Sequence, residues 1–108
     1  MVVGVALLCF VLINLYSVDP NKVDEFLKAF AAVSEAFRRQ PGYISAQLHR
    51  GIAGSGAFVN YAVVESMAEY RKTFADDGVK ASLAKFPPST VAYPHLFTKV
   101  SIPGICVG

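Results

Sequence analysis

The sequence predicts an α+β fold in which a four-stranded antiparallel sheet carries helices on one face, the ferredoxin-like arrangement. The main observation is the order of the hydrophobic patterns, which read strand, helix, strand, strand, helix, strand. The second is the length of 108 residues, which suits one domain rather than two. We therefore expect a single domain over residues 1–108, with an apolar lead-in at 1–9 and a short tail at 103–108.

The first predicted strand is Phe10–Ser17, which is apolar on both faces apart from the amide of Asn14. Such a pattern is typical of a central strand. Asp19 and Pro20 then begin a helix, because Asp is a good N-cap and Pro is tolerated at the first helical position. Apolar residues recur at three- and four-residue steps from Val23 to Phe37, so this helix is expected to pack on the sheet.

A hairpin is predicted next. Tyr43–Arg50 has a half-solvated pattern that fits an edge strand or a subunit contact, and the glycine-rich segment 51–56 supplies the turn. The returning strand runs from about Ala57 to Glu65; apolar or small side chains fill nearly every position, and Asn60 is an amide among them. A buried amide costs free energy unless it finds partners, so Asn60 either joins a hydrogen-bond network or binds a ligand.

The last third of the chain is predicted to hold a second helix, a shorter helix and a final strand. Ser66 to Glu69 form a capping box that begins the second helix. Residues 79–86 continue as a short helix that ends at Pro87 and Pro88. We expect residues 88–94 to form a loop and His95–Ile102 to form the last strand.

The composition indicates a large apolar contact surface. Hydrophobic residues make up 54% of the chain, charged residues make up 17%, and the mean hydropathy is +0.44. One face of the predicted sheet would lie bare in a monomer; it carries Val11, Ile13, Leu15, Val59, Tyr61 and Val63. We therefore predict a symmetric homodimer in which two sheets stack. A net charge of +2, without a basic cluster, argues against a nucleic-acid partner.

The amino-terminal stretch does not predict a membrane span. It is uncharged from Met1 to Ile13, which is shorter than the roughly 20 apolar residues of a transmembrane helix. It also lacks the basic leader and the cleavage site of a signal peptide. Cys9 and Cys106 show neither a disulfide framework nor a metal-binding spacing. We expect two reduced thiols in a cytoplasmic protein without a metal.

Asn14 and Asn60 are the candidate site residues. In the predicted topology they lie on adjacent central strands, and alternation places both side chains on the face that carries the helices. Two amides that converge in an apolar chamber can bind and polarise a carbonyl or phenolate oxygen, as an oxyanion hole does. The alternative is that they hydrogen-bond each other or backbone groups. The residue types leave both interpretations open.

Seven short runs occur in an order that is typical of one family. They are Val11–Asn14, Arg39–Ser45, Gln47–Gly51, Phe58–Ala62, Glu65–Ser66, Pro94–Val100 and Pro103–Val107. Together they span nearly the whole chain and resemble the antibiotic biosynthesis monooxygenase family. This resemblance implies a dimeric α+β barrel, which agrees with the fold predicted above.

Within that family the chain most resembles the cofactor-independent anthrone oxygenases. Such enzymes oxidise an anthrone to a quinone with O₂ and without metal, flavin or haem. The resemblance implies that Asn14 and Asn60 are catalytic and stabilise the anion and the peroxide. It also implies that Tyr70 orients the substrate or relays a proton. We place Tyr16, Val64 and Phe74 beside Tyr70 as substrate-binding residues.

One position departs from the family pattern. The family carries Trp in an N-x-x-x-W-E-S run, whereas Val64 precedes Glu65 and Ser66 in this chain, which has no Trp. Three hypotheses follow: a cofactor-free oxygenase of an electron-rich aromatic, a non-catalytic small-molecule binder, or an isomerase-type enzyme. Haem degradation fits less well, because the pattern of Asn, Trp and a helical His is incomplete. His49 and His95 lie on predicted strands and are expected to be structural.

Overall fold

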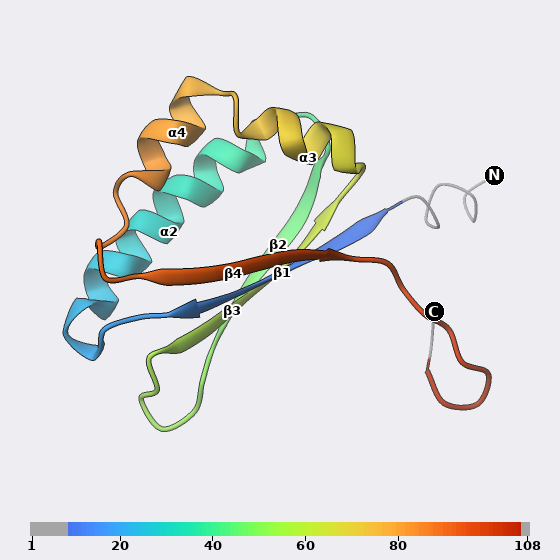
Figure 1. Ribbon diagram of the computed structural model, residues 1–108, viewed down its shortest axis with the longest axis horizontal. Coiled ribbons are helices and arrows are strands. Elements are labelled where there is room, and N and C mark those ends of the chain that lie inside the picture. Colours follow the sequence, from blue (N-terminus) through green and yellow to red (C-terminus); the bar gives the residue numbers. More distant parts are fainter. Residues whose placement is uncertain (1–8, 107–108) are drawn as a thin grey trace.

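The computed structural model describes residues 9–106 and contains the predicted α+β, ferredoxin-like fold. The sheet order is β2-β3-β1-β4, and every neighbouring pair is antiparallel. The strands are β1 (Phe10–Ser17), β2 (Tyr43–Arg50), β3 (Ala57–Val64) and β4 (Val91–Phe97). The helices are η1 (Pro20–Lys22), α2 (Val23–Arg38), α3 (Met67–Thr73) and α4 (Asp77–Leu83). The helices lie over one face of the sheet (Figure 1). Residues 1–8 of the predicted lead-in fall outside the described residues.

The two central strands pair as the sequence predicts. β1 and β3 are adjacent, with Asn14 directly opposite Asn60. Tyr16 opposes Phe58, and both side chains are buried beneath the helices together with Phe26 of α2. The rings of Tyr16 and Phe26 lie 5.1 Å apart in an edge-to-face contact. This aromatic core packs α2 against the sheet and fixes the positions of the neighbouring side chains between the sheet and the helices.

The start of α2 differs slightly from the prediction. The carboxylate of Asp19 accepts a hydrogen bond from the backbone N–H of Asn21 at 2.9 Å, which caps the short 3₁₀ turn η1. The α-helix itself begins only at Val23. Pro20 remains in the first turn, where its missing N–H has no effect on the helical hydrogen bonds.

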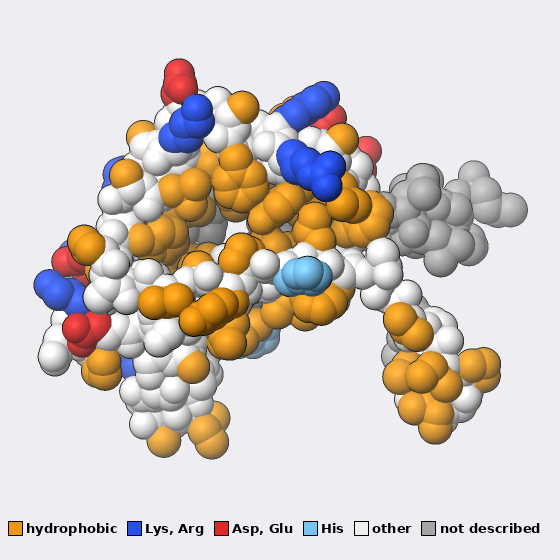
Figure 2. Space-filling model, viewed as in Figure 1, with side chains coloured by type: hydrophobic (Ala, Val, Ile, Leu, Met, Phe, Trp, Pro, Cys, Tyr) orange, Lys and Arg blue, Asp and Glu red, His pale blue; other side chains and the backbone are white. Residues whose placement is uncertain are grey.

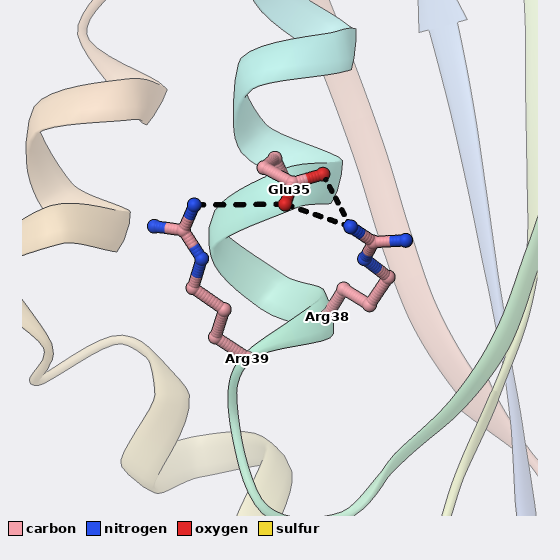
Figure 3. A network of polar contacts seen from close by, with 3 residues as sticks. All are labelled: Glu35, Arg38 and Arg39. Carbon is pink, nitrogen blue, oxygen red and sulfur yellow. Dashed lines mark hydrogen bonds and ion pairs between the residues drawn. The ribbon is translucent and has the colours of Figure 1, made fainter.

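A small charged network closes the other end of α2 (Figure 3). Arg38 Nη2 donates to both carboxylate oxygens of Glu35, at 2.8 and 2.9 Å, and Arg39 Nη2 lies 3.6 Å from Oε1. The hydrogen bond from Arg38 and its charge lower the pKa of Glu35. All three side chains are exposed, so the network belongs to the solvent-facing side of the helix and not to the site.

The last strand was placed wrongly from the sequence. β4 runs from Val91 to Phe97 and not from His95 to Ile102, so much of the predicted loop is strand. The prediction ended the loop at Pro94 because proline is unfavourable inside a sheet. It is tolerated here because β4 is an edge strand next to β1, and one side of it needs no ladder partner.

The outer face of the sheet is apolar and uncovered in a single chain. Leu15, Tyr61 and Tyr93 are 44%, 38% and 63% exposed. Tyr93 lies opposite Leu15 across the pairing of β4 with β1, so the exposed apolar area continues onto the edge strand. We refer to this surface as the outer face. In the described part of the chain no helix is long and apolar enough to cross a membrane.

Candidate functional site

A cavity of about 360 Å³ lies between the sheet and the helices. All four strands and the helices α2, α3 and α4 contribute to its lining. Figure 2 shows hydrophobic side chains gathered around a hollow between the helices and the front edge of the sheet. The volume falls within the range of small-molecule pockets, which run from about 300 to 1,000 Å³. The cavity is therefore the candidate binding site.

All six residues that the sequence singled out line this one cavity. They are Asn14, Tyr16, Asn60, Val64, Tyr70 and Phe74. Four of them come from the helix-facing side of β1 and β3, where strand alternation places them. The other two are Tyr70 of α3 and Phe74, the C-cap residue of that helix.

Asn14 and Asn60, which both line the cavity, each carry an amide oxygen without a hydrogen-bond partner among the described residues. Both of these Oδ1 atoms are buried. The two amides therefore do not hydrogen-bond through these oxygens to each other or to the backbone, which was the alternative left open by the residue types. Since no partner holds either oxygen, the amide planes can present an acceptor or a donor to a ligand.

Two tyrosines supply neutral hydroxyl groups to the same cavity. Burial, and to a lesser extent the nearby Tyr70, raises the pKa of Tyr16 to about 12. Burial also raises the pKa of Tyr70. Both phenols therefore stay protonated at neutral pH and can donate a hydrogen bond to an oxygen of the ligand. The lining residues include no charged side chain, so the cavity favours a neutral ligand.

Two groups of aromatic rings line the cavity. In one, the Tyr16 ring lies 6.2 Å from that of Phe30 and 5.8 Å from that of Phe86. In the other, Phe74 makes edge-to-face contacts with Tyr70 at 5.0 Å and with Phe37 at 5.7 Å. Ring faces and edges of this kind suit a flat aromatic ligand.

Val64 lies at the end of β3 and is 7% exposed. It lines the cavity on the same face as Asn60, four residues earlier along the strand. A valine is smaller than the tryptophan that the family pattern carries at this position, and it has no ring for stacking or electron transfer. Compared with a cavity that carries tryptophan at this position, this cavity therefore has more room beside Val64 and one aromatic group fewer.

Tyr43, Thr90 and Ala92 are among the lining residues that the sequence-based prediction did not identify. A β-bulge between Tyr43 and Ser45 places Tyr43 opposite Val64 and brings it to the helix-facing side. Strict alternation along the strand would put Tyr43 on the same face as Ser45. Thr90 and Ala92 were assigned to a loop, and only the observed start of β4 brings them to the cavity. No local signal in the sequence marks the bulge.

The histidines lie away from the cavity lining. His49 on β2 and His95 on β4 are both exposed and lie on the outer face, opposite Val59 and Ile13. The prediction of His95 at a strand start is wrong, since it lies inside β4. Within residues 9–106 there is no group of three or more His, Cys, Asp or Glu side chains that could hold a metal ion.

Fold and site together define a class: a ferredoxin-like α+β protein with an apolar small-molecule pocket that carries amides. The family model described as antibiotic biosynthesis monooxygenase matches residues 9–85, and the chain belongs to this family. The matched segment contains all six predicted site residues. It ends before β4, so the strand that the sequence placed wrongly also lies outside the family match.

One curated relative is the tetracenomycin-F1 monooxygenase of Streptomyces glaucescens. It is 37% identical to this chain over 68 residues, which cover 62% of the chain. The match spans 60% of that relative's length, so the chain covers less than two thirds of it. Its name states a monooxygenase activity for that protein.

Solved structures show the same fold. SnoaB, a cofactor-independent oxygenase from Streptomyces nogalater, superposes with a TM-score of 0.76 at 23% identity, covering 89% of this chain and 97% of its own. A conserved protein from Methanosarcina mazei superposes with a TM-score of 0.77 at 14% identity, covering 91% and 99%. At these identities the likeness concerns the fold alone.

Proposed function

We propose that this protein is a cofactor-independent monooxygenase that oxidises a small aromatic molecule of the anthrone or quinol type with O₂. The observation that carries the proposal is the pair of opposed amides, Asn14 and Asn60, whose buried oxygens lack partners at the wall of an apolar cavity. An unsatisfied buried amide is costly to the fold. Such a group is most readily kept in a fold where a bound ligand supplies the missing hydrogen bond.

The proposed reaction converts an activated methylene group to a ketone. The methylene loses a proton, its carbanion passes an electron to O₂, and the pair combines to a peroxide. Loss of water then leaves one oxygen atom in the quinone and the other in the water. The methylene carbon is oxidised and O₂ is reduced, so no further reductant is needed.

The cavity residues have distinct tasks in this scheme. The oxygen and nitrogen of a side-chain amide exchange places when its plane turns over, and with their N–H groups towards the substrate Asn14 and Asn60 would stabilise the oxyanion that forms when the methylene loses its proton. Tyr70, protonated at neutral pH, would orient the substrate or return a proton to the peroxide. Tyr16 and Phe74 would hold the aromatic plane, and the apolar walls would keep water from the radical pair.

We further propose that the functional unit is a cytoplasmic homodimer formed through the outer face. The exposed fractions of Leu15, Tyr61 and Tyr93 are high for an apolar sheet surface. A second copy stacked sheet against sheet would bury them, as the family's dimeric α+β barrel implies. The cavity lies on the opposite side of the sheet and stays accessible in such a dimer.

Val64 favours one alternative, a binder that keeps the cavity without the chemistry. The aliphatic side chain is buried at the cavity wall where the family pattern has an indole. An isomerase-type reaction in the same cavity also remains compatible with two polarising amides. These alternatives differ from the oxygenase in one measurable quantity, the consumption of O₂.

The test is O₂ uptake by the purified protein with dithranol, an anthrone. Wild-type protein is compared with Asn60→Ala, Val64→Trp and the control Asn21→Ala, which changes an exposed asparagine outside the cavity. Uptake by wild type and Asn21→Ala that is lost in Asn60→Ala supports the oxygenase. Absence of uptake in wild type contradicts it, and uptake that appears only in Val64→Trp assigns the binder.

A further inference from the structure

Thr90, just before β4, is a third residue of the cavity lining whose side chain carries a buried polar atom without a hydrogen-bond partner in the described part of the chain. Its Oγ1 atom is buried and has no hydrogen-bond partner among the described residues. The Oδ1 atoms of Asn14 and Asn60 are the only other buried side-chain atoms in residues 9–106 for which this holds. All three residues line the one cavity. Within residues 9–106, the residues that carry an unsatisfied buried side-chain atom are therefore all lining residues of the site.

The hydroxyl of Thr90 is not needed to hold its own loop. The backbone N–H of Thr90 donates to the carbonyl of Pro87 at 2.9 Å, which fixes the turn without the side chain. Other buried hydroxyls are satisfied locally: Thr73 Oγ1 donates to the Glu69 carbonyl at 3.0 Å, and Ser82 Oγ donates to the Val79 carbonyl at 2.8 Å. Thr90 differs from both in having a buried hydroxyl oxygen without such a partner.

Thr90 lies well away from the amide pair along the cavity. In the pairing of β1 with β4, Pro94 lies opposite Asn14 and Ala92 lies opposite Tyr16. Thr90 is two residues before Ala92 and four before Pro94, and at roughly 3.4 Å per residue this places it roughly 13 Å from the level of the amides. The aromatic ring of Tyr16 fills the interval on β1.

From this geometry we propose that Thr90 is a second polar anchor, which binds a neutral oxygen at the far end of an elongate aromatic substrate. The proposal rests on the proposed function and specifies its substrate class. One oxygen of the substrate meets Asn14 and Asn60, the flat rings lie along Tyr16, and a terminal hydroxyl or keto oxygen meets Thr90. A hydroxyl can donate to or accept from either group. A charged substituent would find no counter-charge, because the lining has no cationic side chain.

The test uses two ligands that differ only at the far end. One is a linear naphthacenone with a hydroxyl on its terminal ring, and the other is the same ketone without that hydroxyl. Dissociation constants are measured by fluorescence titration without O₂, so that binding is separated from oxidation. The variants are Thr90→Val, which removes the hydroxyl at nearly constant shape, Thr90→Ser, which keeps it, and Ser89→Ala, an exposed neighbour as control.

Wild-type protein is expected to prefer the hydroxylated ligand by about tenfold. Thr90→Val should abolish that preference, whereas Thr90→Ser and Ser89→Ala should keep it. An unchanged preference in Thr90→Val would overturn the inference, and so would the absence of any preference in wild type. O₂ uptake is measured separately on the same proteins. Preferential binding through Thr90 without O₂ uptake would reject the oxygenase and support Thr90 as the polar anchor. O₂ uptake without that preference would support the oxygenase and reject the role of Thr90.

Discussion

Asn14 on β1 and Asn60 on β3 lie directly opposite each other in the sheet, and the side-chain oxygen of each is buried without a partner. Directly opposed residues of an antiparallel pair have Cβ atoms about 5 Å apart. Both amides can therefore contact one small group of a ligand. The fold places this pair at the centre of the sheet, where the flanking strands and the aromatic core hold its geometry.

Removing the Asn60 amide is expected to stabilise the fold while it abolishes function. Asn60→Leu relieves a buried unsatisfied oxygen, so the free energy of unfolding should rise by about 1 kcal/mol. Thr73→Val is the matched control, because its buried hydroxyl donates to the Glu69 carbonyl, and it should lower the free energy by about 0.5 to 1.5 kcal/mol. Urea denaturation measures both. Equal losses in the two variants would show that Asn60 is satisfied in solution.

The same amide should matter strongly for turnover. Asn60→Ala removes a donor to the developing oxyanion, and such a loss costs about a hundredfold or more in kcat. Asn14→Ala should have a similar effect, and the double variant should lose less than the product of the two, because both amides serve one oxygen. Steady-state O₂ uptake with dithranol measures this. Independent, fully multiplicative losses would indicate that the amides act on different groups.

Tyr16 makes stability depend on alkaline pH. Its folded-state pKa is raised to about 12, above the ordinary value of 10.0, because burial disfavours the phenolate. The stabilising contribution of the neutral form is therefore fully present below pH 10 and is lost as the pH rises towards 12. A shift of this size corresponds to about 3 kcal/mol at most. Urea denaturation is measured between about pH 9 and 11, the range in which this contribution begins to be lost. The free energy of unfolding should decline more steeply with pH for wild type than for Tyr16→Phe. Parallel declines would contradict the assignment.

Gly42 is expected to be intolerant of any side chain. Its φ is +90°, and a Cβ atom there would lie 2.6 Å from Cβ of Glu69 at the start of α3. Gly54 provides the control, since its φ is +71° but a Cβ atom would meet nothing within 4 Å. Gly54→Ala should cost about 1 kcal/mol from backbone strain alone, and Gly42→Ala about 3 kcal/mol from strain and overlap together. Thermal unfolding separates them, and equal costs would mean that α3 can move away from the sheet.

The outer face predicts a concentration-dependent dimer. Tyr61→Lys places a like charge on both copies at the stacked sheets and should raise the dimer dissociation constant at least about tenfold. Ile52→Lys is the control, because Ile52 is 90% exposed in the hairpin loop and outside the sheet. Light scattering after size exclusion gives the mass. A wild-type monomer at micromolar concentration would rule out the stacked dimer.

Much of the fold could be predicted because its central elements carry strong local signals. β1 and β3 are apolar on both faces, and Ser66 caps α3 through a hydrogen bond from the Glu69 N–H at 3.1 Å. Strand alternation then placed Asn14 and Asn60 on one face without knowledge of the structure. These features depend on residues close together in sequence, which is why the pattern alone was enough.

The rest of the site depends on tertiary pairing. Pro94 argues against a strand, and only the edge position of β4 beside β1 makes it acceptable. The cavity positions of Thr90 and Ala92 follow from that edge strand. Tyr43 reaches the cavity through a bulge whose register is set by β3 and not by its own neighbours. Sequence patterns do not record either constraint.

The most direct measurement is the fate of dioxygen enriched in heavy oxygen during conversion of dithranol by the purified protein. The proposed mechanism predicts that each quinone product gains one labelled atom, detected by mass spectrometry, and that Asn60→Ala forms little of it. The product formed without protein supplies the background. Product at the background level with wild-type protein, or product without labelled oxygen, would contradict the assignment of this cavity as the site of a cofactor-independent monooxygenase.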